Sequence, residues 1–149
     1  VRASIVERAR AVAEELLMNI IYDAPTDASG SHVYNQLPRT TPVQLKPHEC
    51  GEFLFACDGV VLAVSSIDPF GSLTRDTVLK YLDSCYSGKA GSLNSGKGGA
   101  GRGLFMIAEN ADIVIFNVKK GLQTEVICLF SVDMASANKT SSPSIHLFF

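Results

Sequence analysis

The stretch Glu52-Phe-Leu-Phe-Ala-Cys57, followed by Asp58-Gly59 and Val60-Val-Leu-Ala-Val-Ser-Ser-Ile67, decides the fold of this chain. Two strand-like apolar runs flank the Asp-Gly dipeptide, which favours a tight turn because both of its residues tolerate positive φ. The sequence therefore predicts a β-hairpin with strands over residues 52–57 and 60–67.

A helix is predicted upstream of this hairpin. Apolar residues recur there at three- and four-residue steps, the period of a helix with one buried face. They are Ile5, Ala9, Val12, Leu16 and Ile20. We expect the helix to cover residues 5–21 and Pro25 to end it, because proline lacks the N–H that a helix interior needs.

A second helix is predicted directly downstream of the hairpin, over residues 74–85. Asp76 falls in its first turn, where a carboxylate is favourable to the helix dipole. Five positions share one face of this helix. They are Leu73, Thr77, Val78, Tyr81 and Leu82.

The remaining elements follow a glycine-rich stretch. We expect a third helix over residues 104–111 and a second hairpin with strands over 113–118 and 124–132, joined by Lys119-Lys120-Gly121. A last strand is expected over 145–149.

The order of these elements predicts the fold class. Helix, hairpin, helix, glycine loop, helix, hairpin and strand indicate an α+β fold, a two-layer sandwich in which helices cover one face of a mixed sheet. We expect one domain over residues 1–149. The chain opens on Val1 directly in helix-forming sequence and closes on an apolar run, as expected if either end were a cut through a longer protein.

A long connection separates the first helix from the hairpin. Residues 25–48 contain four of the six prolines, together with Ser29, Gly30 and Ser31. This composition predicts an irregular loop with one short strand near residues 43–45. Loops of this length are uncommon in compact domains and are often functional.

Composition argues against several classes of protein. Among 149 residues, 13 Lys plus Arg stand against 15 Asp plus Glu for a formal charge of −2, which disfavours nucleic acid as a partner. The 46% of hydrophobic residues can bury a core, which argues against disorder throughout. No run approaches the roughly 20 apolar residues of a membrane span and no signal peptide is recognisable, so we expect a cytoplasmic protein without membrane contact.

Neither the cysteines nor the histidines form a recognisable site. The four cysteines contain no CxxC pair, which argues against a zinc ribbon or a thioredoxin-like motif, and we expect reduced thiols. His32, His48 and His146 show no paired ligand spacing, so surface or packing roles are expected for them.

Seven glycines between residues 87 and 103 allow three interpretations as a phosphate-binding motif. Residues 91–97 fit the start of a P-loop, but Gly98 stands where a Ser or Thr hydroxyl would hold Mg²⁺. Residues 96–101 match GxGxxG, but they follow a helix instead of the first strand of a βαβ unit. The third interpretation is a mobile lid running into Gly101-Arg102-Gly103-Leu104, where amides at a helix start could cradle phosphate. A surface loop without a ligand is the alternative.

Two further segments present polar side chains suited to chemistry. Glu15 and Asn19 lie four residues apart, so a helix places them on one face, where one can act as a base while the other holds a metal. Asp68 ends an apolar strand and is followed by Pro69-Phe70-Gly71, a turn where a ligand could meet the backbone. A solvated helix face and a turn-capping carboxylate are the corresponding structural alternatives.

Taken together, Glu15-Leu-Leu-Met-Asn19, Asp68-Pro-Phe-Gly71 and Gly99-Ala-Gly101-Arg-Gly103-Leu104 resemble, in order and spacing, the three signatures of the Bergerat-fold ATPases. This superfamily (GHKL) includes the ATP-binding domains of gyrase, heat-shock chaperones, histidine kinases and MutL. The resemblance covers nearly the whole chain. The phrase Gly101-Arg-Gly103-Leu-Phe-Met-Ile and the short length look most like the anti-sigma-factor serine kinase branch of bacteria.

The resemblance implies a role for each motif residue, with ATP and Mg²⁺ as cofactors. Asn19 would coordinate the Mg²⁺ that bridges the ATP phosphates, and Glu15 would orient or deprotonate the attacking hydroxyl or water. Asp68 would accept the adenine amino hydrogen, and Gly71 would allow close approach of the nucleotide.

The glycine-rich segment would form the lid over the phosphates. Gly99, Gly101 and Gly103 would supply its hinge and phosphate contacts, with Leu104 at the start of the following helix. Lys97 would close on the triphosphate as a point charge, with a solvated lysine as the alternative.

Three other positions complete the comparison with the family. Thr124 matches the strand threonine that often helps hold adenine. Asp23 stands where many relatives have a histidine, and would contact phosphate-bound water or metal. Ser72 and Leu73 follow Gly71 where the family usually carries a second glycine.

The resemblance leaves more than one function open. The first is a serine protein kinase or switch of the anti-sigma kind, acting on a regulatory protein partner and possible as a homodimer. The second is the ATP-binding catalytic domain of a sensor histidine kinase. The third is a non-catalytic nucleotide-binding or partner-binding module, and residues 25–48 could then serve as the partner surface.

Overall fold

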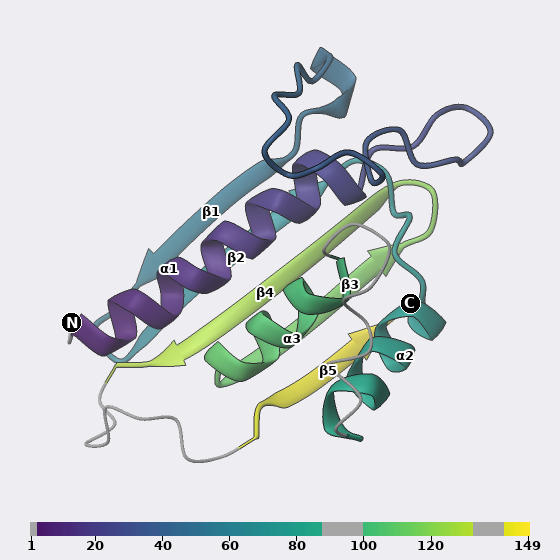
Figure 1. Cartoon of the computed structure of the whole chain (residues 1–149). Helices are drawn as coiled ribbons and strands as arrows, with labels where there is room; N and C mark the ends of the chain where they lie inside the picture. The colour runs from purple at the N-terminus through teal and green to yellow at the C-terminus, as the bar shows by residue number, and fades with distance from the viewer. Residues whose placement is uncertain (1–2, 88–99, 133–141) are drawn as a thin grey trace.

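The computed structural model of the chain describes residues 3–87, 100–132 and 142–149 (Figure 1). Its elements, in chain order, are α1 (Ala3–Met18), η1 (Asn19–Asp23), η2 (Pro47–Glu49), β1 (Glu52–Cys57), β2 (Val61–Asp68), α2 (Arg75–Tyr86), α3 (Ala100–Asn110), β3 (Ile113–Lys119), β4 (Gln123–Ser131) and β5 (Ser144–Phe148). The short element η1 is a π-helix and η2 is a 3₁₀ turn. The predicted order of helices, hairpins and final strand is confirmed.

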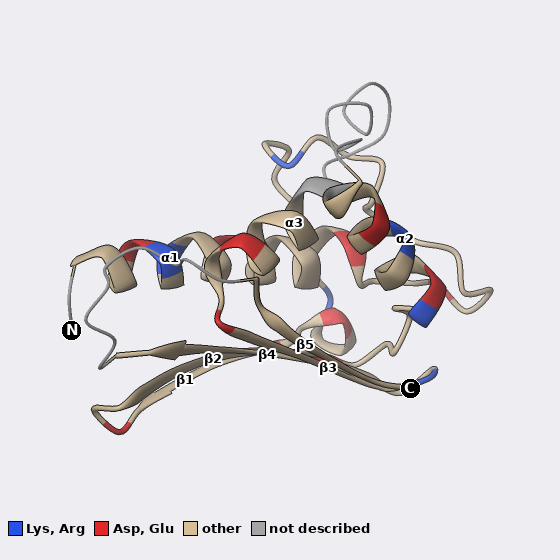
Figure 2. Cartoon of the chain, turned by 90° about the horizontal axis from the view of Figure 1, so that it is seen from below, with Lys and Arg blue, Asp and Glu red and all other residues tan. Residues whose placement is uncertain are grey.

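In the described residues, five strands form one mixed sheet in the order β1-β2-β4-β3-β5. Three neighbouring pairs are antiparallel, and β5 runs parallel to β3 at the far edge. Seen along the sheet, α1, α2 and α3 all lie on the same face (Figure 2). The α+β class, the mixed sheet and the helices on one face are therefore as predicted. In the part of the chain that the structure describes, no helix is long and apolar enough to cross a membrane.

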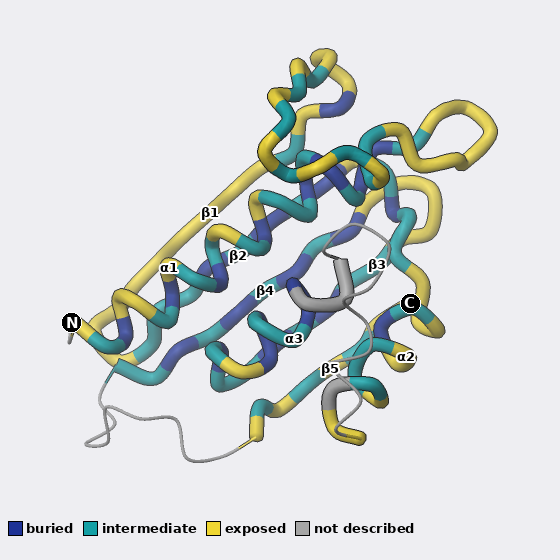
Figure 3. The backbone as a smooth tube through the Cα atoms, in the orientation of Figure 1, coloured by how far each residue is buried: buried dark blue, intermediate teal, exposed yellow. Residues whose placement is uncertain are grey.

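The helices cover the sheet from its centre outward. The helix α1 packs on β2 and β4, α3 lies beside α1, and α2 packs against α3 (Figure 1). Buried positions therefore follow the inner faces of α1, α3 and β4, whereas the edge strand β1 is exposed along its length (Figure 3).

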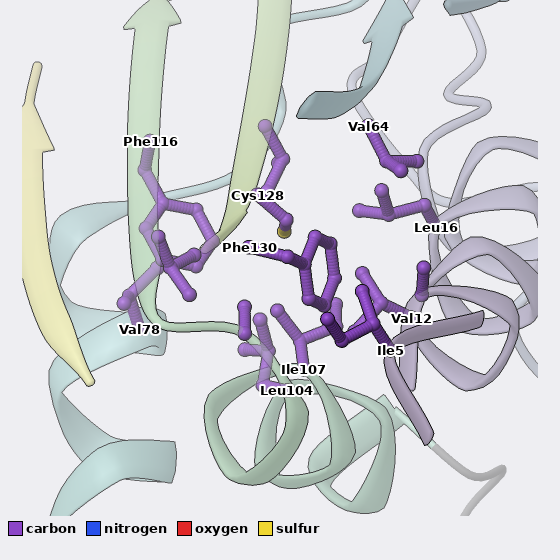
Figure 4. Packing of buried hydrophobic residues seen from close by; sticks show 14 residues of the cluster. Ile5, Val12, Leu16, Val64, Val78, Leu104, Ile107, Phe116, Cys128 and Phe130 are labelled. Atoms are coloured by element: carbon purple, nitrogen blue, oxygen red, sulfur yellow. The ribbon is translucent and has the colours of Figure 1, made fainter. Parts of the chain in front are cut away.

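The core lies between these two layers. Phe130 of β4 is fully buried, and Leu16 and Val12 of α1 approach it from one side and Ile107 of α3 from another (Figure 4). Val78 of α2 closes the core near β3. Burying side chains of this size contributes about 1.5–3 kcal/mol each, so this interlayer contact dominates the stability of the fold.

The first helix is confirmed, but it ends differently from expectation. Its five predicted core positions are all buried. Beyond Met18 the backbone widens, and the N–H of Ala24 donates to the Asn19 carbonyl five residues earlier at 2.8 Å. Pro25 then follows the last turn. The predicted helix over residues 5–21 is thus an α-helix joined to a π-helical turn, and turns of this kind are frequent at functional sites.

The first hairpin is confirmed, with its turn one residue later than predicted. The N–H of Asp58 donates to the Val61 carbonyl at 3.3 Å, so Gly59 and Val60 are the turn residues. Gly59 has a φ of +93°, whereas Asp58 has no positive φ. The Asp58 carboxylate instead accepts the N–H groups of Val60 and Val61 at 2.9 and 2.8 Å. Glycine thus stands first of the two turn residues, as type II′ turns require.

Two local predictions are wrong. Residues 43–45 form no strand, and this part of the connection is irregular up to η2. The helix α3 begins at Ala100 instead of Leu104, so Gly101 and Gly103 lie inside its first turn instead of forming a loop before it. Glycine costs about 1 kcal/mol relative to alanine within a helix, and the prediction followed that local preference.

The helix α2 forms as predicted. Thr74 is its N-cap, and the hydroxyl oxygen of this threonine accepts the N–H of Thr77 at 3.2 Å. Val78 is fully buried, and Leu73, Tyr81 and Leu82 pack against the core.

Candidate functional site

Asp68 and Thr124 form a buried polar pair at one end of the sheet. They lie directly opposite each other in the antiparallel register of β2 and β4. Their exposed fractions are 8% and 4%. Both alternate with core residues such as Val126, so both side chains face the helical layer. The register of the sheet therefore joins two residues that are far apart in sequence.

Asp68 is held by the turn that follows β2. Its Oδ1 atom accepts the N–H groups of Phe70 at 2.9 Å and Gly71 at 3.3 Å. Burial raises the pKa of the Asp68 carboxyl, and the two backbone donors together with neighbouring Thr124 oppose that rise. The predicted turn-capping role is therefore present, and the carboxylate that fills it is buried. Carboxylates with such shifts cluster at functional sites.

Thr124 carries an unsatisfied polar group. Its Oγ1 atom is buried beside the Asp68 carboxyl, whose pKa it lowers, and it forms no hydrogen bond of good geometry in the described part of the chain. Leaving such a group unpaired costs about 1–3 kcal/mol. A bound ligand with a matching polar edge would complete the hydrogen bonding of this hydroxyl.

A cavity of about 190 Å³ lies in front of this pair. The sheet contributes Ser66, Phe116 and Val126 to its walls, in addition to Asp68 and Thr124. The helical layer contributes Asn19, Ile20 and Asp23 from η1, Leu73, Thr77 and Tyr81 from and before α2, and Leu104 and Ile107 from α3. An apolar pocket with a few convergent polar groups is the usual form of a small-molecule site.

The π-helical turn determines how polar residues enter this cavity. Asn19 begins η1 and Asp23 ends it, and both line the cavity. Glu15 lies one turn before Asn19 on α1. The predicted shared face of Glu15 and Asn19 is therefore present, and the wide turn adds Asp23 to it.

At Gly103, the start of α3 lies directly against the side chains of Glu15 and Asn19. A Cβ atom at this position would lie 2.6 Å from Glu15 Oε2 and 3.6 Å from Asn19 Oδ1. Any side chain here would displace the Glu15 carboxylate. The absence of a side chain therefore lets two motifs that are about 90 residues apart meet.

Arg39 was not predicted from the sequence, and it joins two of the acidic residues. Its Nη2 atom lies 2.7 Å from Asp23 Oδ2, and its Nη1 atom lies 3.8 Å from Glu15 Oε2. Burial raises the pKa of Asp23, whereas the Arg39 guanidinium and the nearby His32 lower it. Arg39 thus neutralises acidic groups that the fold removes from water.

The loop that carries Arg39 is fixed to η1. The single O–H of Tyr22 is shared between two acceptors, the Thr41 carbonyl at 2.7 Å and the Arg39 carbonyl at 3.0 Å. Farther along, Glu49 is buried and accepts from Tyr34 and from the Lys46 backbone. The long Pro-rich connection is therefore part of the site, and its length was the one signal that indicated a functional role.

Most residues singled out in the sequence meet at this site. Asn19, Asp23, Asp68, Leu104 and Thr124 line one cavity. Glu15 and Gly103 do not line the cavity, but they lie close to each other and to Asn19, which does. Gly101 lies in the first turn of α3, and Lys97 and Gly99 lie outside the described residues. His32 and Asn35 also line the cavity, without a sequence signal that could have indicated it.

Gly71 also lies outside the lining of the cavity, and it contacts another part of the chain. Its φ is +58°, and a Cβ atom there would lie 2.2 Å from the carbonyl oxygen of Lys119. Its own carbonyl accepts the N–H of Gly121 at 3.1 Å. The close approach that Gly71 allows in this structure is to the turn between β3 and β4, and its expected approach to a nucleotide stays a prediction.

The described residues do not by themselves form a metal site. No group of three or more His, Cys, Asp or Glu side chains placed so that it could hold a metal ion is found in residues 3–87, 100–132 and 142–149. Asn19 offers an amide oxygen, a ligand type that suits Mg²⁺ when phosphates and waters supply the rest of the shell. The donor set therefore fits a metal that arrives with a phosphorylated ligand.

The cysteines described by the structure lie away from this chemistry. Cys50 and Cys57 are exposed free thiols, and burial raises the pKa of Cys128 to about 12. Cys128 therefore acts as a packing residue.

Comparisons of the chain with models of known protein families, with curated proteins and with solved structures returned no match.

Proposed function

We propose that this chain is an Mg-ATP-binding domain of the Bergerat kind that acts as a regulatory serine protein kinase, related to anti-sigma factors. The observation that carries the proposal is the convergence of its three sequence motifs on one cavity. Asn19, Asp68 and Leu104 come from separate motifs and line it together. A set of unrelated surface residues would not be expected to meet in this way.

The buried end of the cavity suits an adenine base. Asp68 offers a carboxylate acceptor, and the unpaired Thr124 hydroxyl can donate or accept. The volume of about 190 Å³ is smaller than the about 300–1,000 Å³ of pockets that enclose drug-sized ligands. It therefore suits a flat ring, with the phosphates outside it towards Asn19 and α3.

The outer end of the cavity suits the phosphates and the transfer step. Asn19 would hold Mg²⁺, and the amides at the start of α3 would lie near the phosphates. Bound ATP would supply the γ-phosphoryl group with ADP as the leaving group, and Mg²⁺ would neutralise the charge that develops during transfer. Glu15, which lies close to Asn19, would accept the proton of the attacking serine hydroxyl of a partner protein.

Calorimetric titration with a non-hydrolysable ATP analogue, with and without Mg²⁺, tests the nucleotide site. We expect magnesium-dependent binding that Asp68→Asn weakens by at least about tenfold, because the amide no longer presents the same acceptor to the base. Asp83→Asn is the matched control, since Asp83 is exposed on α2. Absence of binding by the folded wild-type protein would refute the proposal.

Two further variants separate catalysis from binding. Asn19→Ala is expected to abolish magnesium-dependent binding. Glu15→Gln is expected to retain binding and to lose turnover, measured as phosphate release or transfer to a serine-containing partner. Normal turnover by Glu15→Gln would remove Glu15 from the mechanism. Tight binding by a wild-type protein that shows no turnover would favour a non-catalytic nucleotide-binding module.

A further inference from the structure

Arg39 does not itself line the cavity, but it is held in a fixed position beside Asp23, which does. The Tyr22 hydroxyl is hydrogen-bonded to its carbonyl, and Asp23 binds one end of its guanidinium at 2.7 Å. Its side chain is 22% exposed. An arginine that is fixed at both the backbone and the side chain loses little further entropy when it binds a ligand.

The other end of this guanidinium has an unused donor. Nη1 is buried and has no hydrogen-bond partner in the described residues. Its distance of 3.8 Å from Glu15 Oε2 is that of an ion pair, and it is too long for a hydrogen bond. Buried donors are almost always paired, so an unpaired one requires an explanation.

The charges around this donor indicate the kind of ligand. Glu15 and Asp23 are both acidic, and they precede and follow Asn19 by four residues on the same face of α1 and η1. Without Arg39, these two carboxylates would repel an anion that approached Asn19. A guanidinium at this point compensates that repulsion and can bind an anionic oxygen through its remaining N–H groups.

We infer that Arg39 contacts the terminal phosphate of the bound nucleoside triphosphate and so distinguishes it from the diphosphate. This inference rests on the proposed function, and adds a residue of the Pro-rich connection to the binding site. Tyr22 is then a positioning residue, because it holds the backbone of Arg39 without reaching the ligand.

Affinities for ADP and for a non-hydrolysable ATP analogue, both with Mg²⁺, test the inference by calorimetry. For Arg39→Gln we expect the affinity for the ATP analogue to fall by about tenfold to a hundredfold, as for the loss of a hydrogen bond between charged groups. The affinity for ADP should change by no more than about threefold. Arg10→Gln is the matched control, since Arg10 is exposed on α1 and pairs only with Glu14 among the ion pairs of the described residues.

The outcomes separate this inference from the proposed function. Equal losses for both nucleotides, or no loss, would overturn the role of Arg39 and leave the nucleotide site in place. A wild-type protein that binds neither nucleotide would overturn both. Tyr22→Phe provides a second test if Arg39→Gln fails to fold. It removes only the hydroxyl and should lower the preference for the ATP analogue over ADP, and an unchanged preference would again contradict the inference.

Discussion

At the scale of a single residue, the carboxylate of Asp68 is suited to binding a ligand, but its burial lowers the stability of the ligand-free protein near neutral pH. Its carboxylate is buried, and burial raises its pKa above the ordinary value of 3.8. The folded protein therefore binds a proton at this site more tightly than the unfolded chain does. The resulting stabilisation is fully present below the unfolded pKa and is lost as the pH rises through the raised folded pKa.

Asp68→Asn should therefore stabilise the ligand-free protein near neutral pH. The amide keeps an oxygen for the N–H groups of Phe70 and Gly71 and carries no charge to desolvate. The advantage of the variant in free energy of unfolding should grow as the pH rises from acid to neutral. Urea unfolding of both proteins across this range measures it. Asp23 also titrates with a raised pKa, but it does so in both proteins and cancels from the difference. An advantage that shrinks with rising pH would contradict the assignment.

At the scale of secondary-structure elements, the contact between α1 and α3 determines where Glu15 and Asn19 lie relative to the start of α3. Glu15 and Asn19 present their side chains from α1 and η1, and α3 can approach them only because Gly103 has no side chain. The same start of α3 was expected to be a loop, since glycine disfavours helices. Packing against α1 offsets that local preference.

Gly103→Ala should separate stability from activity. The added Cβ atom would lie 2.6 Å from Glu15 Oε2, which is the mobile end of a long side chain and can move aside. Alanine also favours the helix by up to about 1 kcal/mol, so the free energy of unfolding should stay within about 1 kcal/mol of the wild type. Turnover should fall by about tenfold or more, because a base displaced by about 1 Å loses its geometry. Wild-type turnover would show that the position of Glu15 is unimportant.

The whole molecule is stabilised by contact between one helical layer and one face of the sheet. Phe130 of β4 lies at the centre of this contact and is fully buried (Figure 4). Phe55 of the edge strand β1 is 78% exposed although it has the same side chain. Position in the layers, and not residue type, determines what each phenylalanine contributes.

The pair Phe130→Ala and Phe55→Ala tests this arrangement. Phe130→Ala should lower the free energy of unfolding by about 3–5 kcal/mol, because it leaves a cavity in the core. Phe55→Ala should change it by no more than about 0.5 kcal/mol. Chemical denaturation with the same probe measures both. A larger loss for Phe55→Ala would mean that β1 is packed in a way that the exposed strand does not account for.

The sequence by itself determined the elements and their order. Hydrophobic periodicity and turn chemistry are local properties, so the α1 core positions, the Asp58-Gly59 turn region and the N-terminal part of α2 could be predicted from short windows. The resemblance to the Bergerat-fold ATPases selected Asn19, Asp68 and Thr124 as members of one site, and the three residues line one cavity. Errors remained where local preference was overridden, as at the start of α3, or where no periodic pattern exists, as in residues 43–45.

Only the tertiary structure decided how these residues meet. The pairing of Asp68 with Thr124 depends on the register of β2 and β4, and the meeting of Glu15 with Gly103 depends on how α3 packs. Arg39 could not be predicted, because a single arginine in an irregular loop has no pattern, and its partners Glu15 and Asp23 lie at least 16 residues away. Local sequence encodes propensity, whereas contacts of this kind arise from packing between distant segments, which no short window contains.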